Sequence, residues 1–187
     1  MKYLIAGLGN IGAEYAHTRH NIGFDVLDAL AGASNSFFSP GRLADVAEVR
    51  HRGKKLILIK PTTYMNLSGK AINYWLQQEN IPVENLLVVV DDLALPLGTL
   101  RIRPNGSDAG HNGLKNIQEM LGHQKYARLK FGIGNDYPKG HQVDFVLGKW
   151  LPEEQTTLEP RIKQAVHAVL SFASNGIGNT MANFNNK

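Results

Sequence analysis

The sequence predicts an α/β fold: a single domain, residues 1–187, built on a twisted, mostly parallel mixed sheet with helices on both faces. Short apolar runs typical of strands alternate along the chain with stretches whose apolar residues recur at helical spacing. The run Leu86–Val90, LLVVV, is apolar at every position, as in a strand covered on both faces. A length of 187 residues fits one domain with a sizeable core.

The expected strands are short and are bounded by glycine, proline or charged residues. Residues 43–50 alternate in polarity, and the following turn and dense apolar run predict a β-hairpin that ends at Pro61. Alternation near residue 100 places Arg101 and Arg103 on the outward side of another strand. The expected strands are residues 3–6, 43–50, 55–60, 86–90, 99–103 and 127–133, with a short further one at 143–147.

Four segments carry apolar residues at helical spacing: residues 22–30, 71–76, 114–121 and 151–173. His20 or Asn21 is expected to cap the first of these helices, and Asn66 or Ser68 the second. Glycines 32 and 122 are expected to end the first and third helices.

The C-terminal part of the chain is less regular in its pattern. Pro160 falls inside the last expected helix and predicts a kink or a restart there. The residues beyond Gly176 are mostly polar, so we expect a frayed tail.

Composition excludes several classes of protein. The absence of cysteine removes disulfides, thiolate nucleophiles and cysteine-based metal sites, and it is compatible with a cytosolic protein. No apolar stretch approaches the ~18 residues of a membrane span. The net charge of +4 permits a polyanionic partner without requiring one, and a basic surface with no such partner is equally compatible with it. Basic residues concentrate between residues 101 and 139.

Residues 7–12, GLGNIG, fit the dinucleotide-binding pattern G-x-G-x-x-G. That site also requires an apolar helix after the third glycine and an acidic residue at the end of a second strand. Here Gly12 leads into the polar stretch AEYAHTRHN, and Asp28 falls within a helical pattern. The residues therefore favour a tight turn that needs glycine for its backbone geometry, and a dinucleotide-binding oxidoreductase remains the rival hypothesis.

Polar residues gather at the expected strand ends and helix starts, where α/β proteins place their sites. Each also has an ordinary structural role available: turns or caps for Asn10, Asn66, His20 and Asp91, and core packing for Met65. The four clusters are Asn10 with Tyr15 and His20, Met65 with Asn66, Asp91 with Asp92, and His111 with Asn112.

These residue types support hydrolysis by activated water. A histidine with an aspartate forms a general-base pair, in which the carboxylate fixes the tautomer of the imidazole. The chain has neither a G-x-S-x-G elbow nor a cysteine, so His20 is expected to activate water rather than a side-chain nucleophile. Water attack suits an ester better than an amide, and asparagine amides can hold a peptide carbonyl or an oxyanion. No H-E-x-x-H motif occurs, so no metal site is expected.

Five segments together resemble the bacterial-type peptidyl-tRNA hydrolase family, in the family's order and spacing. They are GLGNIGAEYAHTRHNIGF, PTTYMNLSG, VVVDDLALPLGTLRIRP, GHNGLKNI and RLKFGIG. The resemblance covers nearly the whole chain. It implies a single α/β domain that cleaves the ester between a peptide and the terminal ribose of tRNA, without a cofactor.

The resemblance assigns roles position by position. His20 matches the catalytic base and Asp91 the acid that orients it. Substrate-groove residues of the family match Asn10, Tyr15, Met65, Asn66, His111 and Asn112. Basic residues that face tRNA match Arg101, Arg103, Arg128 and Lys130. The chain departs from the family at Ala94 and Asp108, in two loops, and at Lys130, where some relatives carry arginine.

The implied partner is peptidyl-tRNA, with no membrane involvement, and the implied state is a cytoplasmic monomer. A non-catalytic RNA-binding relative is the second rival, although the presence of both His20 and Asp91 argues against it.

Overall fold

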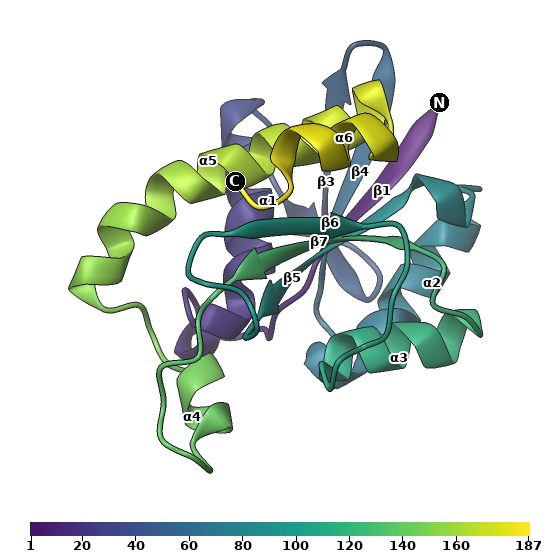
Figure 1. Ribbon diagram of the computed structural model, residues 1–187. Coiled ribbons are helices and arrows are strands. Elements are labelled where there is room, and N and C mark those ends of the chain that lie inside the picture. The colour runs from purple at the N-terminus through teal and green to yellow at the C-terminus, as the bar shows by residue number, and fades with distance from the viewer.

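The computed structural model describes residues 1–187 and contains one seven-stranded mixed sheet (Figure 1). The strands are β1 (Lys2–Gly7), β2 (Ser39–Pro40), β3 (Ala44–His51), β4 (Lys54–Pro61), β5 (Leu86–Asp92), β6 (Leu100–Arg103) and β7 (Ala127–Gly132). Their order across the sheet is β2-β3-β4-β1-β5-β7-β6. The four central strands are parallel, whereas β2, β3 and β6 join the edges antiparallel.

Helices cover both faces, as the sequence predicts. The helices are α1 (Ile22–Ala33), α2 (Ser68–Gln78), α3 (Asn112–Leu121), α4 (Gln142–Val146), α5 (Pro152–Asn175) and α6 (Ile177–Phe184). Short 3₁₀ turns are η1 (Ala13–Tyr15), η2 (Arg19–Asn21), η3 (Met65–Leu67) and η4 (Val83–Asn85). Helices α1 and α5 pack on one face and α2 and α3 on the other (Figure 1). None of the helices combines the length and apolar character needed to cross a membrane.

Strand β5 lies inside the sheet and is buried on both faces, which confirms the prediction from its continuous apolar run. Leu87 and Val89 belong to the core under α1 and α5, whereas Val88 and Val90 belong to the core under α2 and α3. At the carboxyl end of the strand, Asp91 is also buried. The first polar side chain of the strand thus lies at the edge where loops from β1 and β4 also emerge.

Two expected elements are wrong. Residues 143–147 do not form a strand: residues 142–146 are helical and lie against η2 instead of joining the sheet. The residues after Gly176 are not frayed but form α6, which a positive φ of 87° at Gly176 lets fold back on α5. Thr180 is buried there and its hydroxyl lies 2.8 Å from that of Ser171.

Two local details also differ from the sequence prediction. Helix α5 continues through Pro160 rather than restarting, because its apolar face stays packed on the sheet on the C-terminal side of the proline. The N-cap of α2 is Leu67, with no side-chain capping bond, and Ser68 is already its first helical residue.

Candidate active site

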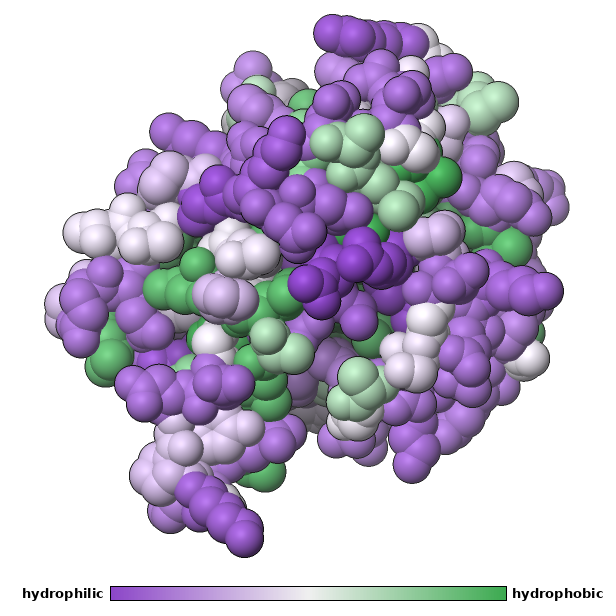
Figure 2. Space-filling model, viewed as in Figure 1, coloured by the Kyte–Doolittle hydropathy of each residue, from purple (hydrophilic) through white to green (hydrophobic).

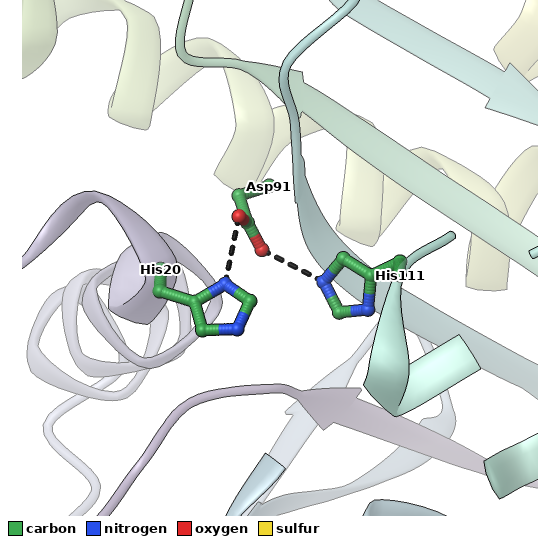
Figure 3. A group of neighbouring side chains, drawn as sticks. All are labelled: His20, Asp91 and His111. Carbon is green, nitrogen blue, oxygen red and sulfur yellow. Dashed lines mark hydrogen bonds and ion pairs between the residues drawn. The ribbon is translucent and has the colours of Figure 1, made fainter. Parts of the chain in front are cut away.

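Three side chains from distant parts of the chain meet at the carboxyl edge of the sheet (Figure 3). His20 comes from η2 just before α1, Asp91 from the end of β5, and His111 from the N-cap of α3. Asp91 Oδ2 lies 2.8 Å from His20 Nδ1, and Asp91 Oδ1 lies 2.9 Å from His111 Nε2. One carboxylate therefore holds two imidazoles, one on each oxygen.

Hydrogen bonds define how each imidazole is protonated. His111 Nδ1 accepts from the backbone N–H groups of Gly113 and Leu114, at 3.1 and 3.3 Å, and so caps α3. Since Nδ1 carries the lone pair, the ring hydrogen of His111 is on Nε2 and is donated to Asp91. His20 donates its Nδ1 hydrogen to the other oxygen, and no protein atom bonds its Nε2. This leaves the basic nitrogen of His20 for a substrate or water.

The charges in the cluster reinforce one another. Burial disfavours the charged form of Asp91, but the attraction of His20 and His111 and the hydrogen bonds from both imidazoles outweigh it and hold the pKa of Asp91 below the ordinary value. Burial likewise lowers the pKa of His20, and the charge and hydrogen bond of Asp91 reverse this, so the net pKa of His20 is raised. The site thus contains an ionised carboxylate next to an imidazole of increased basicity.

The glycine-rich turn after β1 is held by Asn21. Asn21 Oδ1 accepts from the backbone N–H of Asn10 and its Nδ2 donates to the Asn10 carbonyl, both at 2.8 Å. Asn10 Oδ1 in turn accepts from the backbone N–H of Met65 at 2.7 Å. This bond fixes the Asn10 amide, with Oδ1 used and Nδ2 free to donate.

The three glycines of the GLGNIG pattern serve packing and turn geometry. A Cβ at Gly7 would lie 2.3 Å from the carbonyl oxygen of Gly23, so the strand and α1 approach backbone to backbone. A Cβ at Gly9 would lie 2.9 Å from the ring of Phe24, and Gly12 has a φ of 110°. A 3₁₀ turn follows instead of a helix, so this turn lacks the helix N-terminus that a dinucleotide pyrophosphate requires.

A cavity of about 360 Å³ opens beside His20. Asp91, His111 and Asn112 line it with His20, and Lys130 reaches it from β7. Its other side is formed by residues of α4, including Val143 and Val146. A second cavity of about 270 Å³, lined partly by Asn10 and Asn21, lies on the other side of η2.

Four basic residues alternate with core residues on β6 and β7. In the antiparallel register, Arg101 pairs with Lys130 and Arg103 with Arg128. Burial lowers the pKa of Lys130, and the positive charges of the three arginines on β6 and β7 lower it further. The negative charge of Asp92 acts in the opposite direction but does not outweigh them. Near the middle of the view in Figure 2, the most strongly hydrophilic surface gathers in front of these two strands. We call Arg101, Arg103 and Lys130 the basic strip.

Similarity to known proteins decides the family. A family profile described as peptidyl-tRNA hydrolase matches residues 4–187. The chain belongs to the peptidyl-tRNA hydrolase family. A peptidyl-tRNA hydrolase of Phocaeicola vulgatus is 60% identical over 187 residues, 100% of both chains, and one of Bacteroides fragilis is 58% identical over the same coverage. A crystal structure of peptidyl-tRNA hydrolase from Acinetobacter baumannii matches with a TM-score of 0.92 at 31% identity, covering 98% of this chain and 94% of that chain.

The structure brings together the core of the residue set that the family resemblance assigns. His20, Asp91, His111 and Asn112 line one cavity, and Asn10 lies on the adjoining turn. The exposed Asn66 and the half-buried Tyr15 line neither cavity. Substrate contacts by these last two therefore remain predictions.

Met65 and Arg128 differ from the expected roles. Met65 is 4% exposed, and its side chain packs in the core. Its contribution to the site is its backbone N–H, which donates to Asn10 Oδ1. Arg128 is 1% exposed, and its guanidinium donates to the carbonyls of Gly106, Gln124 and other loop residues. Because that charge is used inside the protein, we remove Arg128 from the expected phosphate contacts.

Two contributors were missed by sequence reasoning. The sequence predicts only a cap of α1 for Asn21, although its side chain fixes the turn that carries Asn10. No sequence pattern assigns a role to Arg19, although it is buried next to the proposed base. The adjacency of both residues to His20 was the one available signal, and their long-range partners are invisible in the sequence.

The His20–Asp91–His111 cluster is also the one group of potential metal ligands in the structure. Each imidazole nitrogen lies at hydrogen-bond distance, 2.8–2.9 Å, from a different oxygen of Asp91. The donor set as arranged makes two imidazole–carboxylate hydrogen bonds, and the second nitrogen of His111 caps α3.

Proposed function

We propose that this protein hydrolyses the ester that joins a peptide, or an N-blocked amino acid, to the terminal ribose of tRNA, with His20 as the base that activates water. The observation that carries the proposal is the Asp91-bound His20, with Nε2 unpaired beside a cavity of about 360 Å³. Membership of the peptidyl-tRNA hydrolase family supports the choice of substrate.

In the proposed reaction, His20 Nε2 takes a proton from water as the water oxygen attacks the ester carbonyl carbon. Asp91 stabilises the resulting imidazolium through the Nδ1 hydrogen bond. The imidazolium then returns the proton to the ribose oxygen as the carbon–oxygen bond breaks, which gives a peptide acid and a free tRNA hydroxyl. Water, ester and imidazole supply every atom and proton, so the mechanism as written includes no cofactor.

Three asparagines are assigned to positioning and charge stabilisation. The Nδ2 hydrogens of Asn10 are available because its Oδ1 is bonded to the Met65 N–H. We assign Asn10 and Asn66 to the peptide and the oxyanion. Asn112 lines the cavity with His20 and is assigned to the water or the ribose end.

We assign the basic strip to the phosphates of the tRNA acceptor stem. Like charges placed opposite each other destabilise a sheet, and bound phosphates would relieve that repulsion. Lys130 belongs both to this strip and to the cavity beside His20. Phosphate contacts of this kind position the substrate and carry no sequence information.

The chain is proposed to act as a monomer in the cytoplasm. Every residue assigned to the reaction comes from one chain, so the site needs no second copy. Peptidyl-tRNA arises where translation takes place, and the proposed role is to recycle tRNA from aborted translation.

The test is single-turnover cleavage of an N-acetylated aminoacyl-tRNA. Replacing His20 with alanine is expected to slow cleavage by about 10²–10⁴-fold, because the general base is lost. The exposed His167 on α5 provides a control, and His167→Ala is expected to cleave at the wild-type rate. A His20→Ala rate within a few-fold of the control would refute the assignment of the base. RNA binding without cleavage by the wild-type protein would favour a non-catalytic relative.

A further inference from the structure

Arg19, the residue before the proposed base, is almost completely buried, at 6% exposed. Its Nη2 lies 2.8 Å from Glu154 Oε1 at the start of α5. Its guanidinium carbon lies 4.2 Å from the centre of the Phe145 ring and 5.5 Å from that of Trp150. A buried arginine with both a charged partner and aromatic neighbours is a fixed structural element.

The segment 135–148, which contains α4, lies on Arg19 and has no buried residue of its own. Two hydrogen bonds join this segment to the rest of the protein, and Arg19 donates both of them. The Arg19 backbone N–H donates to the Gly148 carbonyl at 3.0 Å, and Nη1 donates to the Phe145 carbonyl at 3.1 Å. The backbone of residue 19 supplies the first bond, and the Arg19 side chain supplies the second. The remaining attachment is the packing of the partly buried Phe145 and Val146 against the core, so the Arg19 side chain makes the one side-chain hydrogen bond to this segment.

The Arg19 side chain fits closely against its partners on both sides, Gly148 and Glu154. A Cβ at Gly148 would lie 2.8 Å from Arg19 Nη1, so the glycine makes room for the guanidinium. Glu154 Oε1 accepts from the Leu151 backbone N–H as well, at 2.8 Å, which fixes the carboxylate to the first turn of α5. A continuous set of contacts thus runs from α5 through Arg19 to α4.

Helix α4 is one wall of the cavity beside His20. Gln142, Val143 and Val146 line the cavity across from His20 and His111. Val143 is 66% exposed, which is unusual for an apolar side chain and places it at the open side of the cavity. The position of this wall sets the width of the space into which the substrate must fit.

We propose that Arg19 is a positioning residue for substrate binding: by joining Glu154 to Phe145 and Gly148, it holds α4 as the wall of the active-site cavity. The inference rests on the proposed function for its substrate. Arg19 does not touch the reacting atoms, and its loss leaves the His20–Asp91 pair in place. Its effect is therefore expected on substrate affinity rather than on the chemical step.

The test compares Arg19→Met and Arg19→Lys with the wild type. A lysine keeps a charge for Glu154 but cannot also bond the Phe145 carbonyl and stack on two rings. For both variants we expect KM for N-acetylated aminoacyl-tRNA to rise about tenfold with kcat within about threefold of wild type. Hydrogen exchange of the free protein should accelerate at least about tenfold in residues 142–148 and stay unchanged in β5.

Arg50→Met is the matched control, since Arg50 has a 74% exposed side chain on β3 and only a 3.7 Å contact with Glu48. This control variant should change neither KM nor the hydrogen exchange of residues 142–148. A fall in kcat at constant KM, or unchanged exchange in residues 142–148, would overturn the proposal. If Arg19→Met fails to fold, Arg19→Lys decides. If the wild type leaves the ester intact, the proposed function fails, and the exchange comparison still decides whether Arg19 holds α4.

Discussion

At the scale of single residues, the catalytic proposal depends on how one carboxylate is shared. Asp91 bonds His20 through one oxygen and His111 through the other, and its side chain is 3% exposed. His111 accepts two backbone N–H bonds as the cap of α3, and its other ring nitrogen bonds Asp91. His20 differs in that its second ring nitrogen bonds no protein atom.

This arrangement predicts the pH dependence of the reaction. His20 acts as a base only when unprotonated, and its pKa is raised above the ordinary 6.5. Activity should therefore be low below the His20 pKa and rise with pH to a plateau above it, with the midpoint of kcat/KM above 6.5.

Asp91→Asn is the variant that tests the cause of this shift. Burial of His20 persists while the attraction is removed, so the midpoint of the rise should move to lower pH, and the plateau rate should fall. The pH profile of single-turnover cleavage measures both. A midpoint that stays in place after Asp91→Asn would show that Asp91 does not set the basicity of His20.

At the scale of elements, β6 and β7 show how one pattern of charge divides into two roles. Arg103 and Arg128 are cross-strand partners, yet Arg103 is half-buried at the surface while Arg128 lies beneath the loop from residue 104 to residue 110. The same antiparallel pair thus contains one surface cation, which we propose contacts tRNA, and one cation that binds the protein's own carbonyl groups.

The two arginines are expected to respond differently to replacement. Arg103→Gln should weaken tRNA binding. It should also reduce the steepness of the slope of log affinity against log salt concentration by about 0.7–0.9, the amount expected for the loss of one phosphate contact. Arg128→Met should leave that slope unchanged and lower the free energy of unfolding by about 1–3 kcal/mol, because buried carbonyls lose their donor. Salt titrations of tRNA binding and urea denaturation measure the two effects. Equal salt slopes for wild type and Arg103→Gln would place the tRNA elsewhere.

At the scale of the whole molecule, the C-terminal residues close the edge of the sheet. Strand β6 is an edge strand, and Asn185 after α6 pairs with it as a further strand would. Asn185 Oδ1 accepts from the Ile102 N–H at 2.6 Å, its Nδ2 donates to the Ile102 carbonyl, and the Asn186 N–H donates to the Leu100 carbonyl. An edge covered in this way is protected from pairing with other chains.

Asn185→Ala should therefore destabilise the protein by about 1–3 kcal/mol, since the Ile102 N–H loses its partner. Asn183→Ala, at an exposed position of α6, is the control and should have little effect. Chemical denaturation gives the stability, and light scattering near the midpoint reports association through the uncovered edge. Equal stability of the two variants would show that this pairing contributes nothing.

Much of the fold follows from local patterns. The continuous apolar run of β5, the alternation before the β3–β4 turn and the helical spacing of α1, α2, α3 and α5 were sufficient for the α/β class. The short apolar run at 143–147 misled, because four or five residues do not distinguish a strand from a helical turn. The prediction of a frayed tail was wrong because polar composition does not reveal that the Thr180 hydroxyl pairs with the buried hydroxyl of Ser171.

The sequence by itself determined the fold class and the family, because these depend on residue type, order and spacing, and it named the site residues as predictions. Only the tertiary structure decided that Asp91 bonds two imidazoles and that Arg128 donates to loop carbonyls. It also decided that Lys130 lines the cavity and that Arg19 bonds the Phe145 carbonyl and so holds α4. The physical reason is that a side chain's partners are set by strand register and by the loops that cover it. Those contacts join residues up to 135 positions apart, and no local pattern records them.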